Sequence, residues 1–208
     1  MYYKVLYNEF EVQKKGEIKM NKTTKIVIAA VGIVAVIAVA VILLMNSKPK
    51  TNLEPIKNNE DLSALVDKIY DGLESEMPMV QTQEIDVTDS DMVQYETGIN
   101  NANDIEYAVV SKPMMSSQAY SLVLVKVKDG VNANEIAKQM NENADLAKWI
   151  CVSAEIAYST SSGNVVCLVM SSERVAKPIY EKFKTLAGTT GKEYEKVEAE
   201  PELPPEMY

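Results

Sequence analysis

Histidine is absent from the 208 residues of this chain, and cysteine, phenylalanine and tryptophan are scarce, with two, two and one residues. Without histidine the chain lacks the usual general base near neutral pH, the commonest metal ligand and the usual partner of a nucleophilic serine or cysteine. No Walker loop, dinucleotide fingerprint or paired-cysteine metal spacing occurs. We therefore predict no catalytic, cofactor-binding or metal-ligating residue and no cofactor. A histidine-free hydrolase that uses a Ser-Lys pair or two carboxylates remains an alternative.

One long apolar run stands out, from Ile26 to Met45, and it contains no charged or strongly polar side chain. About 20 residues that rise ~1.5 Å each match a hydrocarbon core about 30 Å thick. A cleaved signal peptide would have a shorter apolar core, of about 7 to 15 residues, followed by small residues. No cysteine near the end of the run could carry a lipid. We therefore predict one uncleaved transmembrane helix that contacts the lipid bilayer.

Basic residues predict the orientation of this helix, because six lysines precede it and three follow soon after. Residues 1–25 then form a cytoplasmic N-terminus, and the C-terminal domain lies outside the cell membrane. Translation starting at Met20 would shorten that N-terminus. The codons for residues 14–19 must be purine-rich and can spell a bacterial ribosome-binding sequence, so both starts remain open.

Charge divides at the end of the apolar run. Residues 1–45 hold six lysines and three acidic residues, so the remaining 15 basic and 27 acidic residues give residues 46–208 a net charge of −12. Such a balance repels phosphate backbones and anionic headgroups. We therefore predict no nucleic-acid partner for this acidic part of the chain.

Composition divides the rest of the chain into three parts. Residues 46–59 are polar with two prolines and predict a linker, and the acid- and proline-rich residues 191–208 predict a disordered tail. Residues 60–190 are then one folded domain. Apolar periodicity, turn residues and caps within it predict, in chain order, a helix capped at Asn58 or Asn59, a short helix ending at Gly98, strands at 105–110 and 120–127, a helix closing near Trp149, strands at 153–158 and 165–170, and a helix at 172–186.

The order strand-strand-helix thus occurs twice. This order predicts an α+β fold in which an antiparallel sheet carries helices on one face.

The two cysteines, Cys151 and Cys167, would lie outside the cytoplasm, where disulfides form. With a turn centred on residues 162–163, Cys167 lies opposite Tyr158 and Cys151 is several residues from the pairing point. That separation exceeds the limit of about 7 Å between bridged Cα atoms. We therefore predict two buried, free thiols.

Five methionines could suggest a soft-metal site, but they are spread through unlike predicted elements, and methionine commonly fills hydrophobic cores. We interpret them as core residues: Met77, Met79, Met92, Met114 and Met115.

The helical stretch DLSALVDKIYDGL and the stretch GNVVCLVMSS followed by a helix resemble a family of uncharacterised extracytoplasmic domains of anaerobic Gram-positive bacteria. The resemblance covers residues 61–186. It implies a membrane-anchored location and this fold type, and it carries no catalytic residues. We accordingly expect a non-catalytic binding or interaction module of the cell envelope, with an envelope protein or peptidoglycan as partner; the sequence does not define the oligomeric state.

Overall fold

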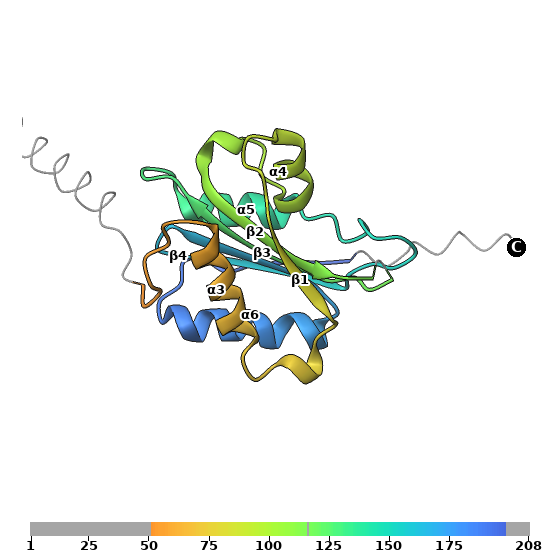
Figure 1. The fold of residues 1–208 in the computed structure, drawn as a ribbon. Coiled ribbons are helices and arrows are strands. Elements are labelled where there is room, and N and C mark those ends of the chain that lie inside the picture. The colour runs from red at the N-terminus through yellow and green to blue at the C-terminus, as the bar shows by residue number, and fades with distance from the viewer. Residues whose placement is uncertain (1–50, 116, 199–208) are drawn as a thin grey trace, which may run out of the picture. The chain divides into compact units, whose positions relative to one another are not determined.

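Six antiparallel strands form the centre of the fold in the computed structural model, which describes residues 51–115 and 117–198 (Figure 1). The predicted α+β class is confirmed. In chain order the strands are β1 (Val80–Glu84), β2 (Ile105–Pro113), β3 (Ser121–Val127), β4 (Ile156–Ser162), β5 (Val165–Ser171) and β6 (Tyr194–Val197). Among the described residues the α-helices are α3 (Asn59–Tyr70), α4 (Ser90–Thr97), α5 (Ala133–Glu142) and α6 (Glu173–Ala187), and the short 3-10 helices are η2 (Glu74–Glu76) and η3 (Ala102–Asp104).

The predictions for residues 1–25 and for the transmembrane run Ile26–Met45 lie outside the described residues, as does the part of the predicted tail from 199 to 208. Within residues 51–115 and 117–198, no helix has both the length and the apolar character needed to cross a bilayer.

The strands lie in the order β1-β2-β3-β5-β4-β6, and each pair is antiparallel. β2 and β3 form the hairpin that the sequence predicts, and β4 and β5 form a second one. Gly163 takes a φ of 60° at the first position of the β4–β5 turn, where a two-residue hairpin favours glycine. The structure adds the edge strands β1 and β6, and it shifts β4 from the predicted residues 153–158 to Ile156–Ser162.

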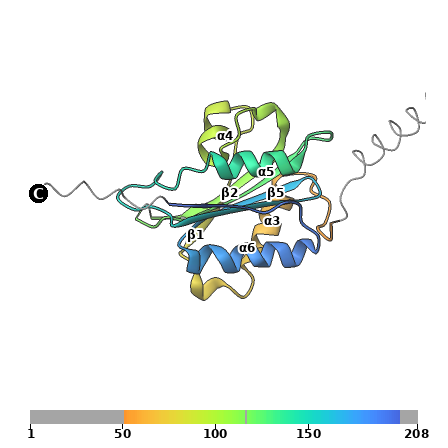
Figure 2. The ribbon, with the colours of Figure 1, turned by 180° about the vertical axis from the view of Figure 1, so that it is seen from behind.

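Helices cover both faces of the sheet (Figure 1, Figure 2), so the prediction of helices on one face is wrong. The central strands explain why. Every residue of β3 is buried, and alternate side chains point to opposite faces. Leu122 and Leu124 pack with α3 and α6, whereas Val123 and Val125 pack with α4 and α5. A sheet with two apolar faces needs a helical layer on each of them.

Helix ends follow the capping residues of the sequence. Asn58, Asp89 and Asn132 each accept backbone N–H groups at the start of α3, α4 and α5. Gly98 and Gly188 follow the last residues of α4 and α6 with positive φ, a common way for a helix to end. The predicted short helix ending at Gly98 is thus confirmed, and Asp89 caps its start.

Helix α5 ends earlier than its periodicity predicts. It stops at Glu142 and not near Trp149, and Ala147, which lies between them, is exposed. The Asp145 side chain accepts the backbone N–H of Ala147 at 3.0 Å, a local bond that competes with helix formation. Residues 143–155 therefore form an irregular loop at one end of the sheet.

Both flanks of the predicted domain extend further than expected. The Asn52 N–H donates to the Ala187 carbonyl at 2.9 Å, and Leu53 and Ile56 pack against the core under α3 and α6. These residues of the predicted linker belong to the folded domain. Residues Tyr194–Val197 form β6 along β4, so the prediction of disorder from residue 191 is wrong for this stretch. Pairing with β4 and the packing of Tyr194 on the core hold β6 in place.

Candidate functional site

Exposed large hydrophobic side chains gather at one end of the domain. Tyr95, Met114 and Met115 are 61%, 63% and 68% exposed, and they line one cavity of about 330 Å³. Three further exposed residues adjoin them: Met79, whose carbonyl accepts the Met114 N–H at 3.1 Å, Met92, one helical turn before Tyr95, and Ile150, which follows the lining residue Trp149. Among the described residues, Val197 alone is a large exposed hydrophobic elsewhere. A patch of this kind marks binding surfaces in soluble domains.

This cavity, which we call the cleft, is built by segments that are distant in sequence. The last turn of α4, the end of β2, the start of β3 and the loop after α5 each contribute to it. Its lining comprises Tyr95, Glu96, Lys112, Pro113, Met114, Met115, Tyr120, Ser121, Lys148 and Trp149.

Glu96 is the acidic centre of the cleft and is only 7% exposed. Its carboxylate accepts the Lys112 ammonium at 2.7 Å and the Lys148 ammonium at 3.2 Å. Burial alone would raise the pKa of this carboxyl, but the hydrogen bond from Lys112 and the charge of Lys148 together hold it below its usual value. Two ammonium groups share one carboxylate, so these three side chains carry a net charge of +1.

Lys148 is held between that carboxylate and two aromatic rings. Its Nζ lies 5.3 Å from the ring centroid of Tyr95 and 5.5 Å from that of Trp149, within the range of cation-π attraction. Burial lowers the pKa of Lys148, while the charge of Glu96 acts in the opposite direction. These contacts fix the loop after α5 against α4, and they place charged groups beside apolar side chains in the lining of the cleft.

Ser121 adds an unusual feature to the cleft. Its hydroxyl is buried, with 1% of the residue exposed, and it makes no hydrogen bond to any described residue. A buried hydroxyl normally has a partner. Ser111 also has a hydroxyl without a close partner, but it lies on the opposite face, near Tyr70, whose pKa it lowers against the larger effect of burial. Among the described residues, Ser121 is the buried, unpartnered hydroxyl that lines a cavity.

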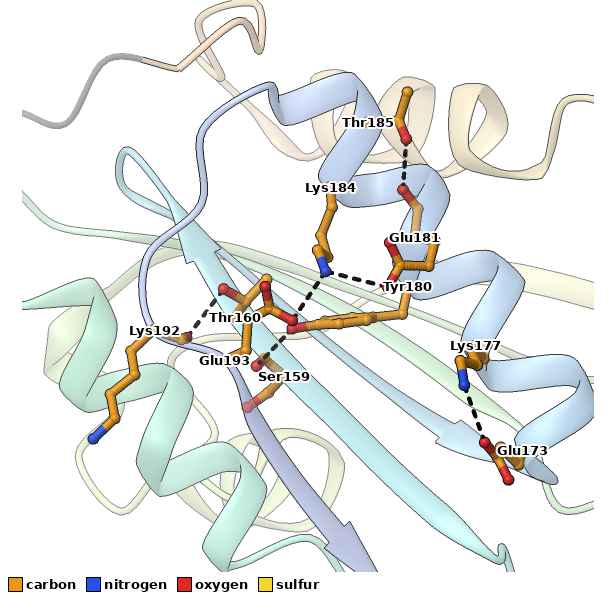
Figure 3. Close-up of polar contacts among 10 residues, drawn as sticks. All are labelled: Ser159, Thr160, Glu173, Lys177, Tyr180, Glu181, Lys184, Thr185, Lys192 and Glu193. Atoms are coloured by element: carbon orange, nitrogen blue, oxygen red, sulfur yellow. Dashed lines mark hydrogen bonds and ion pairs between the residues drawn. The ribbon is translucent and has the colours of Figure 1, made fainter.

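A second charged cluster lies between α6 and the strands β4 and β6 (Figure 3). Lys184 Nζ lies 3.1 Å from a Glu181 oxygen and 3.0 Å from a Glu193 oxygen, while the Tyr180 hydroxyl donates to the Ser159 carbonyl at 3.3 Å. Burial works against the charged form of Lys184, but hydrogen bonds with Glu193 and Glu181 outweigh it and raise its pKa. These contacts fasten the segment before β6 to α6, which is a structural role.

A larger cavity, of about 480 Å³, lies beside the start of α6. Two of its polar groups have partners within the domain: the Glu155 carboxylate accepts the Glu173 N–H at 2.9 Å, and the Ser171 hydroxyl donates to the Ala119 carbonyl at 2.9 Å. None of the described residues that line it has a buried side-chain atom without a partner, as Ser121 has, and the exposed large hydrophobic side chains lie elsewhere. The cleft is therefore the stronger candidate.

The cysteines are both free, as predicted, but they differ in burial. Cys167 is fully buried in β5, where its Cα pairs with that of Thr160. Burial raises the pKa of its thiol strongly. Cys151 lies in the loop after α5 with a φ of 62° and is exposed, so the prediction of two buried thiols is wrong for this residue.

No site residue is predicted from the sequence, and the prediction that the five methionines are core residues is wrong for most of them. Met77 packs partly against the core, but Met79, Met92, Met114 and Met115 are exposed around or beside the cleft. No recognised sequence motif includes Lys112, Lys148 or Ser121. One feature of the sequence does indicate an exposed apolar surface. Met114 and Met115 follow Pro113 in the polar connection between two predicted strands, where an apolar pair is unusual.

Comparison with known proteins by family model, by sequence and by solved structure gives no match. The resemblance to extracytoplasmic domains described above therefore stays a prediction.

Proposed function

We propose that this protein is a non-catalytic binding module of the cell envelope, anchored by residues 26–45, and that the cleft is its binding site. The observation that carries the proposal is one cavity that is lined by three exposed large hydrophobic side chains, with three more next to its lining residues, and that also holds a buried, unpartnered hydroxyl. Exposed apolar surface costs solubility, and its concentration at one place is typical of a surface that a partner covers.

The position of the first described residue supports this use of the cleft. The Thr51 hydroxyl lies 2.8 Å from the Ser162 hydroxyl, next to the β4–β5 turn. Ser121 lies at the other end of the strands, because it pairs with Met170 near the end of β5. Five steps of about 3.3 Å along β5, from Val165 to Met170, separate the two ends by roughly 17 Å. Thr51 therefore lies well away from the cleft and does not cover it.

The Ser-Lys form of the alternative, a histidine-free hydrolase, would need an amine that is hydrogen-bonded to a nucleophilic hydroxyl and takes its proton. No described amine makes a hydrogen bond to Ser121, and both lysines of the cleft contact Glu96. Both amines point to the carboxylate of Glu96, so neither is placed to take a proton from Ser121. These contacts favour binding.

Photo-crosslinking in intact cells tests the proposal. A photoreactive amino acid replaces Met114 in the cleft or, as a matched control, Val197 in β6, since these residues are 63% and 61% exposed. In the full-length protein we expect a covalent adduct with an envelope component at position 114 and little or none at 197. Equal adducts at both positions, or recovery of the protein from the culture medium and not from membranes, would contradict the proposal.

A further inference from the structure

Lys112 and Ser121 are cross-strand neighbours on the face of the sheet that α5 covers. Lys112 is two residues beyond Val110, and Ser121 is two residues before Val123, and both valines belong to the core on that face. The register pairs Ser111 with Leu122, so the next pair along the strands is Lys112 with Ser121. Side chains at such positions have Cβ atoms about 4.5 to 5.5 Å apart. The Lys112 and Ser121 side chains therefore start from neighbouring positions, and both residues line the cleft.

Both groups have hydrogen-bonding capacity left for a ligand. The Ser121 hydroxyl has no partner, and the Lys112 side chain, which is 39% exposed, makes its hydrogen bond to Glu96. An ammonium has three donors, so Lys112 retains donors for a second acceptor. The cleft thus offers two hydrogen-bond donors, and its charged side chains have an excess of one positive charge. An acceptor with a single negative charge suits both features.

The surroundings restrict the ligand further. Tyr95, Met114, Met115 and Trp149 line the same cavity, so the group next to the anion must be apolar. The rest of the domain is strongly acidic, and the cleft offers neither arginine nor a helix N-terminus, the usual partners of phosphate. A monoanionic carboxylate fits these conditions better than a phosphate, which carries more charge than the cleft can neutralise.

We infer that the cleft binds the C-terminal carboxylate of an apolar peptide, with Lys112 and Ser121 as donors to the carboxylate and the aromatic and methionine side chains as the surface for its last residues. This inference rests on the proposed function, because it names the partner chemistry of the same cleft.

Tryptophan fluorescence tests the inference, because Trp149 is the single tryptophan of the chain and lines the cleft. Full-length protein in detergent micelles is titrated with a pool of N-acetylated tripeptides of alanine, valine, leucine, isoleucine, methionine and phenylalanine. One pool carries free carboxylates and the other carries C-terminal amides. We expect the acid pool to shift the Trp149 emission at concentrations about tenfold lower than the amide pool, since a hydrogen-bonded charge contributes roughly this factor.

Variants assign the effect to the two donors. Ser121→Ala removes a hydroxyl that has no contact to lose, and it should weaken binding of the acid pool about threefold to tenfold while binding of the amide pool stays unchanged. Lys112→Met should abolish the difference between the pools. Lys138→Met serves as the control, because Lys138 is an exposed α5 residue that pairs with Glu142 away from the cleft. Thermal unfolding of each variant verifies that it is folded.

Two outcomes would overturn the inference, and they bear differently on the proposed function. Equal binding of acid and amide pools at Trp149 would exclude carboxylate recognition and leave the cleft as a binding site. No change of Trp149 emission with either pool would also exclude it, and the crosslinking at Met114 would then decide the proposed function independently.

Discussion

The two ends of the central strands differ in how far their polar side chains are hydrogen-bonded within the fold. Where the chain enters, near the β4–β5 turn, the strand hydroxyls have partners. The Ser162 hydroxyl donates to the Thr189 carbonyl at 2.6 Å and lies 2.8 Å from the Thr51 hydroxyl, and Ser161 donates to the Asn134 side chain at 2.9 Å. At the cleft end, Ser121 has no partner and apolar side chains face solvent. The first end is satisfied within the fold, and the second retains capacity for a ligand.

The charged neighbours of the lysines also differ between the α6 cluster and the cleft. Lys184, at the α6 cluster, has two acidic neighbours, and its pKa is raised by their hydrogen bonds despite burial. At the cleft, Lys148 shares a single carboxylate with Lys112, and burial lowers its pKa. An excess of acid around one lysine fixes structure, while an excess of lysine around one acid leaves positive charge for a partner.

The largest effect is expected from Glu96→Gln, which removes the charge that both cleft lysines share. Because Lys148 stays buried without a counter-ion, the free energy of unfolding should fall by about 3 kcal/mol. Urea unfolding at neutral pH measures it. Glu142→Gln, which removes an exposed contact with Lys138, is the control and should cost less than about 0.5 kcal/mol. A similar small loss for both variants would show that the cleft charges are solvated.

The difference in stability between the original protein and Glu96→Gln should depend on pH. The pKa of Glu96 is lower in the folded protein than in the unfolded chain. Its contribution to stability is therefore complete above the ordinary glutamate value of about 4.3 and is lost as the pH falls through the lower folded value. The difference in stability between the original protein and Glu96→Gln should shrink only below about pH 4.3.

A smaller loss is expected from Ser162→Ala, at the satisfied end of the strands. This change removes the hydroxyl that donates to the Thr189 carbonyl and lies 2.8 Å from the Thr51 hydroxyl, and it should lower the free energy of unfolding by about 1 to 2 kcal/mol. Chemical denaturation measures this difference. If the stability stayed the same, these hydrogen bonds would contribute little to the fold, and the contrast between the two ends of the strands would be wrong.

The smallest effect on stability is expected from Ser121→Ala, the matched change at the cleft end. Since this hydroxyl has no partner, its removal should leave the free energy of unfolding within about 0.5 kcal/mol or raise it slightly. The comparison with Ser162→Ala under identical denaturation conditions is the sharpest test of the contrast. A loss as large as that of Ser162→Ala would mean that Ser121 has a structural partner and is not available to a ligand.

Local chemistry determined much of the fold. The caps Asn58 and Asn132 and the glycine Gly188 that ends α6 act through neighbouring residues, so short-range sequence suffices to place these helix ends. The same holds for the hairpin of β2 and β3. The apolar runs of β3 and β5 also contain the signal that both faces of the sheet are buried, since they lack the polar alternation of a half-exposed strand. That signal was available and predicts helical layers on both faces.

The edge strands and the loop after α5 depended on long-range contacts. β1 and β6 have weak patterns of their own and are held by pairing with β2 and β4. Helix α5 could have continued toward Trp149 on periodicity alone, but the Asp145 side chain bonds locally and the loop is tied to α4 through Lys148.

The sequence by itself determined the charge of the chain, its apolar run, the absence of histidine chemistry and the class of the fold, because composition and short-range periodicity suffice for these. Only the tertiary structure decided the site. Glu96 meets Lys112 across 16 residues and Lys148 across 52, and no local pattern encodes such distances. Whether a methionine fills the core or borders a cleft likewise depends on which side chains the folded sheet leaves uncovered.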